Sequence, residues 1–422
     1  MDTRTRALID FVQEKFGLDQ YVLKTHQFYR QVTLFNETVY SLSMEWLPNH
    51  AAGSDEDLNP AGTAVAEIDV TTRKIKSIIF VEDHSFANGI GFDSRDHKAI
   101  INWVEKETGL TYGRHFQLEK EEKGHLYFYE CIDGIKLFPP GDLEIQWDAA
   151  GRLLTFTNNT RHPDKTQIKK EVYALNLEKL GNLAKKQLSF FNAPMVEHEK
   201  MVPLYAVEET FVSNTEQEII PYQSVLLEKP YIARNQVMFW EAPYAGKAFE
   251  EKEIQLTETI TSEQAFSGEP SPDAQRMTLS EQERCVTSVQ AFLSQKYPDD
   301  SGKWTLKQIY RDKGYIHAVL RRTQQSGFIL QRKLVIFLDR LSLSVCNFID
   351  NKLMIDSIMG FQPSAGRTLT KEQAYEKLAP LLELEPYYVC DRNAHQFMLC
   401  GKLDCRCGVD ASNGKVFTLD AL

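Results

Sequence analysis

The chain has 422 residues, 42% of them apolar and 25% charged, which is the composition of a globular rather than a disordered protein. Its formal net charge is -11, and an acidic surface repels both nucleic-acid phosphates and anionic lipids. The composition therefore argues against nucleic-acid and membrane partners. A single core stops growing at about 250–300 residues, so we expect two or more domains.

The start of the sequence and its cysteine content both indicate a cytoplasmic protein. Met1–Arg6 run directly into a helical pattern and show no apolar signal core. The sequence contains no run of about 18 consecutive apolar residues that would span a membrane. Seven cysteines, an odd number, fit a reducing compartment in which thiols stay unpaired.

Helical patterns recur along the chain, and strand-like sequence follows each of them. Apolar residues repeat at helical spacing, as Leu8, Ile9 and Val12 do in the first pattern. Thr370 with Gln373 three residues later forms a capping box at the start of the last. The predicted helices are 5–16, 96–108, 170–191, 279–297 and 370–382.

Short hairpin signatures lie within the strand-like segments, each with an apolar strand end, an aspartate, a turn and a second strand. The aspartates are Asp69, Asp148, Asp339 and Asp410. An aspartate at the start of a turn accepts hydrogen bonds from later backbone amides. A late glycine supplies the left-handed conformation that bulged hairpin loops require. Gly151 and Gly414 hold that place in two turns, and the other two turns lack the glycine, which makes them less typical.

The alternation of one helix with several antiparallel strands predicts an α+β protein of tandem units, each a helix packed on an antiparallel sheet. We expect two such units in residues 1–160 and a third, degenerate unit in 161–250. The polar, turn-rich stretch 251–273 is interpreted as a linker. Two further units are expected in 274–422.

Two ends of the last predicted unit resemble a known family. Thr370–Leu378 reads TKEQAYEKL at the helix start, and Val409–Val416 reads VDASNGKV at the hairpin. Together they resemble a PepSY-type unit, and Phe128–Ile135 before Asp148–Arg152 is similar to the same pattern. The whole chain resembles the YcdB/YcdC-repeat group of Gram-positive spore-formers. The resemblance implies cystatin-like helix-on-sheet units, a role in binding or restraining peptidases, and no catalytic residues.

Cysteines near the C-terminus are the candidates for a metal site. Cys405 and Cys407 lie two residues apart and share a face if they lie on a strand. Cys400 on a neighbouring strand and His395 would add ligands, and thiolate and imidazole suit zinc. The spacing matches no C-x-x-C motif, and free cysteine is also a small buried hydrophobe, so structural thiols are the competing interpretation.

The sequence lacks the common motifs of nucleotide binding and hydrolysis, namely GxxxxGK[ST], HExxH and GxSxG. We therefore expect no cofactor. The leading hypothesis is a non-catalytic interaction module that binds a protein or peptide partner, a peptidase among the candidates, through its sheet faces and edges. Two alternatives stay open: a hydrolase whose site is assembled from residues distant in sequence, and a metal- or ligand-binding protein that uses the C-terminal cysteines.

Overall fold

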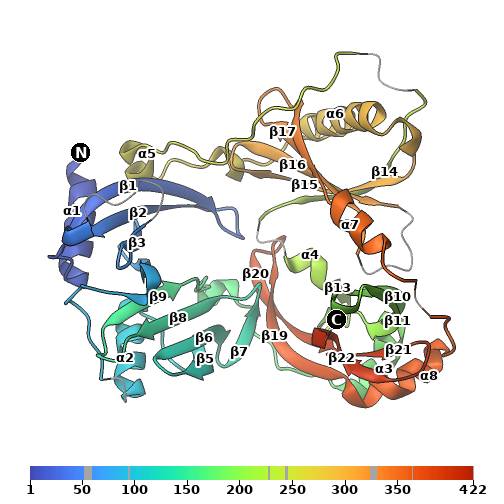
Figure 1. Cartoon of the computed structure of the whole chain (residues 1–422), viewed down its shortest axis with the longest axis horizontal. Coiled ribbons are helices and arrows are strands. Elements are labelled where there is room, and N and C mark those ends of the chain that lie inside the picture. Colours follow the sequence, from blue (N-terminus) through green and yellow to red (C-terminus); the bar gives the residue numbers. More distant parts are fainter. Residues whose placement is uncertain are drawn as a thin grey trace. The chain divides into compact units, whose positions relative to one another are not determined.

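The computed structural model describes residues 1–51, 59–93, 96–226, 229–242, 246–323, 330–363 and 365–421. The described residues form helices and mainly antiparallel sheets, which confirms the predicted α+β class (Figure 1). No described helix is both long and apolar enough to cross a membrane. The chain divides into two compact units. Unit 1 comprises Met1–Lys170, Glu258–Ser271 and Tyr387–Met398, and unit 2 comprises Glu171–Thr257, Pro272–Pro386 and Leu399–Leu422.

Unit 1 begins with a helix packed on four antiparallel strands. These elements are α1 (Thr3–Phe16), β1 (Tyr21–Val32), β2 (Thr38–Pro48), β3 (Ala64–Asp69) and β4 (Ile75–Phe80). Helix α1 starts where the Asp2 carboxylate accepts hydrogen bonds from first-turn amides. It ends at Gly17, whose φ of 62° favours glycine. Leu8 and Val12 on its apolar face pack in the same core as Trp46 of β2.

The second half of unit 1 has the same order of a helix followed by strands. Its elements are α2 (His97–Thr108), β5 (Phe116–Glu122), β6 (His125–Ile132), β7 (Ile135–Phe138), β8 (Asp142–Trp147) and β9 (Leu153–Asn158). Because β9 pairs with β4, one sheet runs in the order β1-β2-β3-β4-β9-β8-β6-β5. Ile100 and Val104 of α2 join the core beneath α1. Strand β7 also pairs in parallel with Tyr387–Val389 of β19 (Glu383–Asp391).

Residues Glu258–Ser271, which lie inside the predicted linker and contain helix α5 (Ser262–Ser267), pack on unit 1. Ile260 forms an antiparallel bridge with Phe28 of β1. The Glu258 carboxylate accepts hydrogen bonds from the Arg30 guanidinium at 2.9 and 3.1 Å. This segment is therefore an ordered part of unit 1 that covers the free edge of β1.

One sheet of unit 2 packs under a long helix. Its elements are β14 (Ile232–Met238), α6 (Leu279–Lys296), β15 (Trp304–Asp312), β16 (Tyr315–Arg322), β17 (Lys333–Asp339) and β18 (Val345–Asp350). Thr278 and Glu281 form a capping box that starts α6. Val289 and Leu293 of this helix are fully buried in one core with Trp304 of β15.

The other main sheet of unit 2 has the order β10-β11-β21-β22 and packs against two helices. Its elements are α3 (Leu177–Gln187), β10 (Leu188–Met195), β11 (Lys200–Val207), α8 (Lys371–Leu378), β21 (Cys407–Asp410) and β22 (Val416–Thr418). The prediction of a helix over 170–191 is wrong at both ends, and Leu188 begins a strand. Also in unit 2, wholly or in part, are β12 (Thr210–Ser213), β13 (Ile219–Pro221), α4 (Tyr222–Leu226), α7 (Lys352–Met359) and β20 (Gln396–Asp404).

The four predicted aspartate turns share one hydrogen-bonding pattern. In each turn the backbone N–H of the aspartate donates to the carbonyl of the residue just before the next strand, at 2.9–3.0 Å. The aspartate carboxylate accepts backbone N–H groups from inside the turn. The predicted role of Asp69, Asp148, Asp339 and Asp410 is confirmed.

A left-handed residue stands near the end of each of these turns. Gly151 and Gly414 adopt the left-handed conformation with φ of 83° and 74°. In the two turns that lack glycine, Arg73 and Leu343 adopt it with φ of 56° and 59°. Hydrogen bonding and strand pairing hold a side-chain-bearing residue there at a cost in backbone strain. The derivation of these hairpins from one repeated unit stays a prediction.

Candidate protein-interaction groove

Strand β10 is one edge of the sheet β10-β11-β21-β22. Its sequence, LSFFNAPM, contains two phenylalanines and no charged residue. Among the described strands it pairs with β11 alone, from Leu188 opposite Val207 to Met195 opposite Lys200. An uncharged edge strand of eight residues offers a row of backbone groups to another extended chain.

The pairing with β11 determines which backbone groups of β10 point outward. The Glu208 N–H donates to the Gln187 carbonyl just before the strand. In an antiparallel ladder every second pair is hydrogen-bonded, so the N–H and C=O of Phe190, opposite Tyr205, point away from β11. The backbone of Pro194 also faces away from β11, but proline has no N–H to donate. The outer edge is therefore open around Phe190 and closed to pairing at Pro194.

The first strands that follow other helices are covered or charged at their outer edges. The edge of β1 carries the bridge to Ile260, and the edge of β15 pairs with β14. Strand β5, also an edge, ends in the charged run Glu119–Glu122. Covering and charge are the usual devices that stop an edge strand from pairing with other chains. In the described part of the chain, the first half of β10 has neither.

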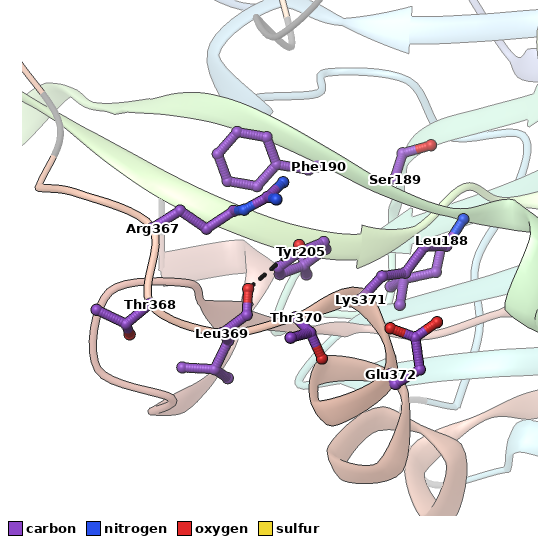
Figure 2. A pocket seen from close by; sticks show the side chains of 10 residues that line it. All are labelled: Leu188, Ser189, Phe190, Tyr205, Arg367, Thr368, Leu369, Thr370, Lys371 and Glu372. Carbon is purple, nitrogen blue, oxygen red and sulfur yellow. Dashed lines mark hydrogen bonds between the residues drawn. The ribbon is translucent and has the colours of Figure 1, made fainter.

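A hollow of about 610 Å³ opens beside the first three residues of β10 (Figure 2). We call it the β10 groove. One wall is formed by β10 and β11, and the other by the chain that leads into α8 together with the first turn of that helix. Its lining residues are Leu188, Ser189, Phe190, Tyr205, Arg367, Thr368, Leu369, Thr370, Lys371 and Glu372.

The wall that leads into α8 is held by hydrogen bonds within unit 2. The backbone N–H groups of Thr368 and Leu369 both donate to the Ala411 carbonyl, at 2.8 and 3.0 Å. The Tyr205 hydroxyl donates to the Leu369 carbonyl at 3.4 Å, across the floor of the groove (Figure 2). Because both walls are already in place, an occupant would bind without the cost of ordering them.

Positive charge lines the β10 groove. The Arg367 guanidinium lies over the Phe190 ring, 5.3 Å from its centre, and Lys371 stands in the first turn of α8 (Figure 2). Neither cation forms an ion pair with a described residue. The Glu372 carboxylate is 3.8 Å from the Lys185 ammonium, which offsets its charge. Among the described residues, therefore, no carboxylate pairs with these two cations of the groove, in a chain whose net charge is -11.

The groove offers binding groups rather than a catalytic set. None of its ten described lining residues is a histidine, cysteine or aspartate. A hydroxyl there, such as that of Ser189, has no imidazole to act as its base. The outward backbone of Phe190, an aromatic ring and two cations are the groups with which a polypeptide can be held. The hydrolase alternative gains no support from this groove.

Neither a protein-family model nor a curated protein matches the chain in sequence. One solved structure that is similar is the Bacillus megaterium YpeB C-terminal domain, at 10% sequence identity and a TM-score of 0.25. The match covers 51% of this chain and 96% of that domain. A TM-score of 0.25 does not establish a shared fold, so the PepSY-type resemblance stays a prediction.

The candidate metal ligands are divided between the two units, with Cys400, Cys405 and Cys407 in unit 2 and His395 in unit 1. In unit 2, Cys400 and Cys405 are fully buried and Cys407 is half-buried. Burial raises the pKa of the Cys405 thiol and so disfavours the thiolate that binds metal. In unit 1, the His395 ring stacks on Phe35 at 5.8 Å. No three histidine, cysteine, aspartate or glutamate side chains gather to hold a metal ion in the described ranges, so the metal site stays a prediction without support here.

A cluster of titratable groups in unit 1 also has a structural explanation. Glu130 is 3% exposed, and burial raises the pKa of its carboxyl group. Its carboxylate accepts the backbone N–H groups of Arg161 and His162 at 2.7–3.0 Å. Burial lowers the pKa of His162 and of His115, whose rings lie 5.5 Å apart. The carboxylate thus anchors the segment that follows β9.

Residues of the β10 groove were not among the sites predicted from the sequence. The run Leu188–Met195 was taken partly as the end of a helix, and Arg367 lies in a polar segment with no motif. An uncharged aromatic run that stops at Pro194 is a signal for an edge strand, and it could have located one wall. No local signal indicates that the start of α8 forms the other wall.

Proposed function

We propose that this chain is a non-catalytic interaction protein that binds an extended segment of a partner protein along the outer edge of β10. The observation that supports it is the uncovered, uncharged edge at Phe190, which opens into a preformed groove with cations on its far wall. An added strand gains main-chain hydrogen bonds from the edge and side-chain contacts from the groove. The PepSY-type resemblance favours a peptidase as the partner.

Selection of random peptides on the whole chain tests this proposal. Peptides that bind are measured by fluorescence anisotropy against wild type, Phe190→Pro and Phe190→Leu. Proline removes the outward N–H, whereas leucine removes the aromatic ring and keeps the N–H. Phe190→Pro is expected to weaken binding at least tenfold, and Phe190→Leu considerably less. Thermal unfolding of each variant shows whether the sheet is intact.

A second measurement leaves the protein unchanged. Each selected peptide is made in two N-methylated forms that lack alternate backbone N–H groups. A peptide added as a strand directs only one of the two sets toward β10, so one form should lose binding and the other should keep it. Equal binding of both forms, together with unchanged binding to Phe190→Pro, would refute the proposal.

A further inference from the structure

The charges of the β10 groove carry an inference about its occupant, which rests on the function proposed above. We infer that the groove selects acidic segments: an extended partner strand that pairs near Phe190 and directs an aspartate or glutamate side chain toward Arg367 and Lys371. Nothing in the pairing of backbone groups would require this preference, because main-chain hydrogen bonds are the same for every sequence.

The placement of Arg367 is the first reason. Its guanidinium covers the ring of Phe190, the residue whose backbone N–H and C=O face the partner. The N–H groups of a guanidinium lie in its own plane, so stacking on an aromatic ring leaves them free at its edge. A carboxylate can accept two parallel hydrogen bonds from that edge. A carboxylate on the added strand would therefore meet this fork next to the backbone pairing that positions it.

The lack of a described carboxylate paired with either cation is the second reason. Glu372, the acidic residue in the lining, lies beside Lys185, and no described carboxylate pairs with Arg367 or Lys371. Lys371 stands in the first turn of α8, where the unsatisfied N–H groups of a helix favour negative charge. Two cations beside a helix start would attract an anionic side chain and repel a cationic one.

The same charges disfavour a second copy of this chain as the occupant. An isologous contact would pair β10 with β10 around a two-fold axis. Such an axis near Phe190 would bring the Arg367 and Lys371 of both copies to one place, and like charges in close contact oppose association. A strand of opposite charge from another protein has no such penalty.

Three labelled probes that differ at one position test the inference. They are nonapeptides of alternating threonine and valine whose central residue is glutamate, glutamine or lysine. An exposed ion pair contributes a factor of about 1.5–5 in affinity, so the two cations together should favour the glutamate probe over the glutamine probe about tenfold in Kd at low salt. This advantage should shrink between about 50 and 300 mM NaCl, because salt screens exposed charges.

Variants assign the preference to the groove. Arg367→Gln combined with Lys371→Gln should bring the Kd values of the glutamate and glutamine probes to within about twofold. Arg276→Gln is the matched control, because Arg276 is an exposed arginine of unit 2 outside the groove, and this variant should keep the preference. Thermal unfolding of each variant confirms that the sheet is intact.

The outcomes separate this inference from the proposed function. If the three probes bind equally and one N-methylated form of each fails, the strand-binding function stands and the acidic preference is wrong. If the selected peptides bind along β10 but the glutamate probe does not bind, the strand-binding function stands and the acidic preference is wrong. If neither N-methylated form of any bound peptide loses affinity and Phe190→Pro binds unchanged, both are wrong. A dimer in sedimentation that Phe190→Pro abolishes would also overturn the inference, because the occupant would then be a second copy.

Discussion

Replacing Arg73 with glycine is expected to stabilise the hairpin between β3 and β4. Arg73 stands four residues after Asp69 with φ of 56°, the place that Gly414 holds after Asp410 with φ of 74°. The Arg73 side chain is exposed and forms no ion pair with a described residue. The substitution therefore relieves backbone strain and removes no stabilising contact.

Two opposing effects determine the size of this gain. A left-handed conformation costs a residue other than glycine about 1–2 kcal/mol. Glycine also increases the conformational entropy of the unfolded chain, which lowers the free energy of unfolding by about 0.4–1 kcal/mol. Removing an exposed side chain changes stability by less than about 0.5 kcal/mol in either direction. The expected net gain is about 0.5–1 kcal/mol.

Hydrogen exchange of β3 and β4 peptides is the appropriate assay, because a chain of two units is not expected to unfold in one step. Protection of the hairpin amides should rise about two- to fivefold in Arg73→Gly. Arg73→Ala removes the same side chain but keeps a Cβ atom, so it should show no gain. A gain of equal size in Arg73→Ala, or a loss of protection in Arg73→Gly, would refute the assignment of strain to this residue.

Three further substitutions test the packing and ionisation of buried groups. Gly141→Ala should destabilise unit 1 by about 1–3 kcal/mol, measured by hydrogen exchange of its strand amides, because the new Cβ atom would clash with Oε2 of the buried Glu130 side chain. Burial raises the pKa of Glu130 in the folded protein. Its contribution to stability is therefore full below the unfolded pKa of about 4.3 and is lost as the pH rises through the folded pKa. Glu130→Gln should remove this fall in stability with rising pH, as seen in melting temperatures measured at a series of pH values. Burial opposes ionisation of Asp350, but hydrogen bonds from Arg332 and Tyr297 outweigh it and lower the pKa of this carboxyl group. Asp350→Asn should cost about 2–3 kcal/mol of unfolding free energy near pH 7, less than a fully buried pair because both partners keep 12–14% exposure. Because the folded pKa of Asp350 is lowered, this contribution is full above the unfolded pKa of about 3.9, and the difference from wild type should disappear only as the pH falls through the lower folded pKa.

Matched controls distinguish these effects from general sensitivity to substitution. Asp356→Asn removes a carboxylate whose pair with Lys352 is more than half exposed, so it should cost less than about 1 kcal/mol. Gly91→Ala adds a Cβ atom with nothing within 4 Å and should be nearly neutral. Losses in these controls equal to those in Asp350→Asn and Gly141→Ala would contradict the physical reasons given for the buried sites.

The α+β class, the starts of the predicted helices other than the one placed at 170–191, and the aspartate turns were predictable from the order of residues. Thr370 and Gln373 form the expected capping box, and Asp410 accepts hydrogen bonds from its own turn. Such features depend on groups a few residues apart, whose reach is limited by the geometry of one turn of chain. They form in the same way whatever packs around them.

Features that depend on a distant partner were not predictable in this way. Leu180, Ala184 and Leu188 are all buried at a spacing of four residues, so the helical period continues past the point where the helix ends. Pairing with β11 makes Leu188–Met195 a strand, and a local pattern carries no information about that partner. Ile260 likewise docks on β1 from a segment whose polar composition resembles a linker.

The groove shows this division most clearly. Turn and cap chemistry specified the start of α8, and that part was visible in the residues around Thr370. Whether the edge of β10 is covered, and whether Arg367 reaches Phe190, depends on which strands pair and which segments pack together over long separations in the chain. Neighbouring residues determine local hydrogen bonds. An edge strand stays open when no other strand or segment of the chain packs against it, and that depends on the whole fold.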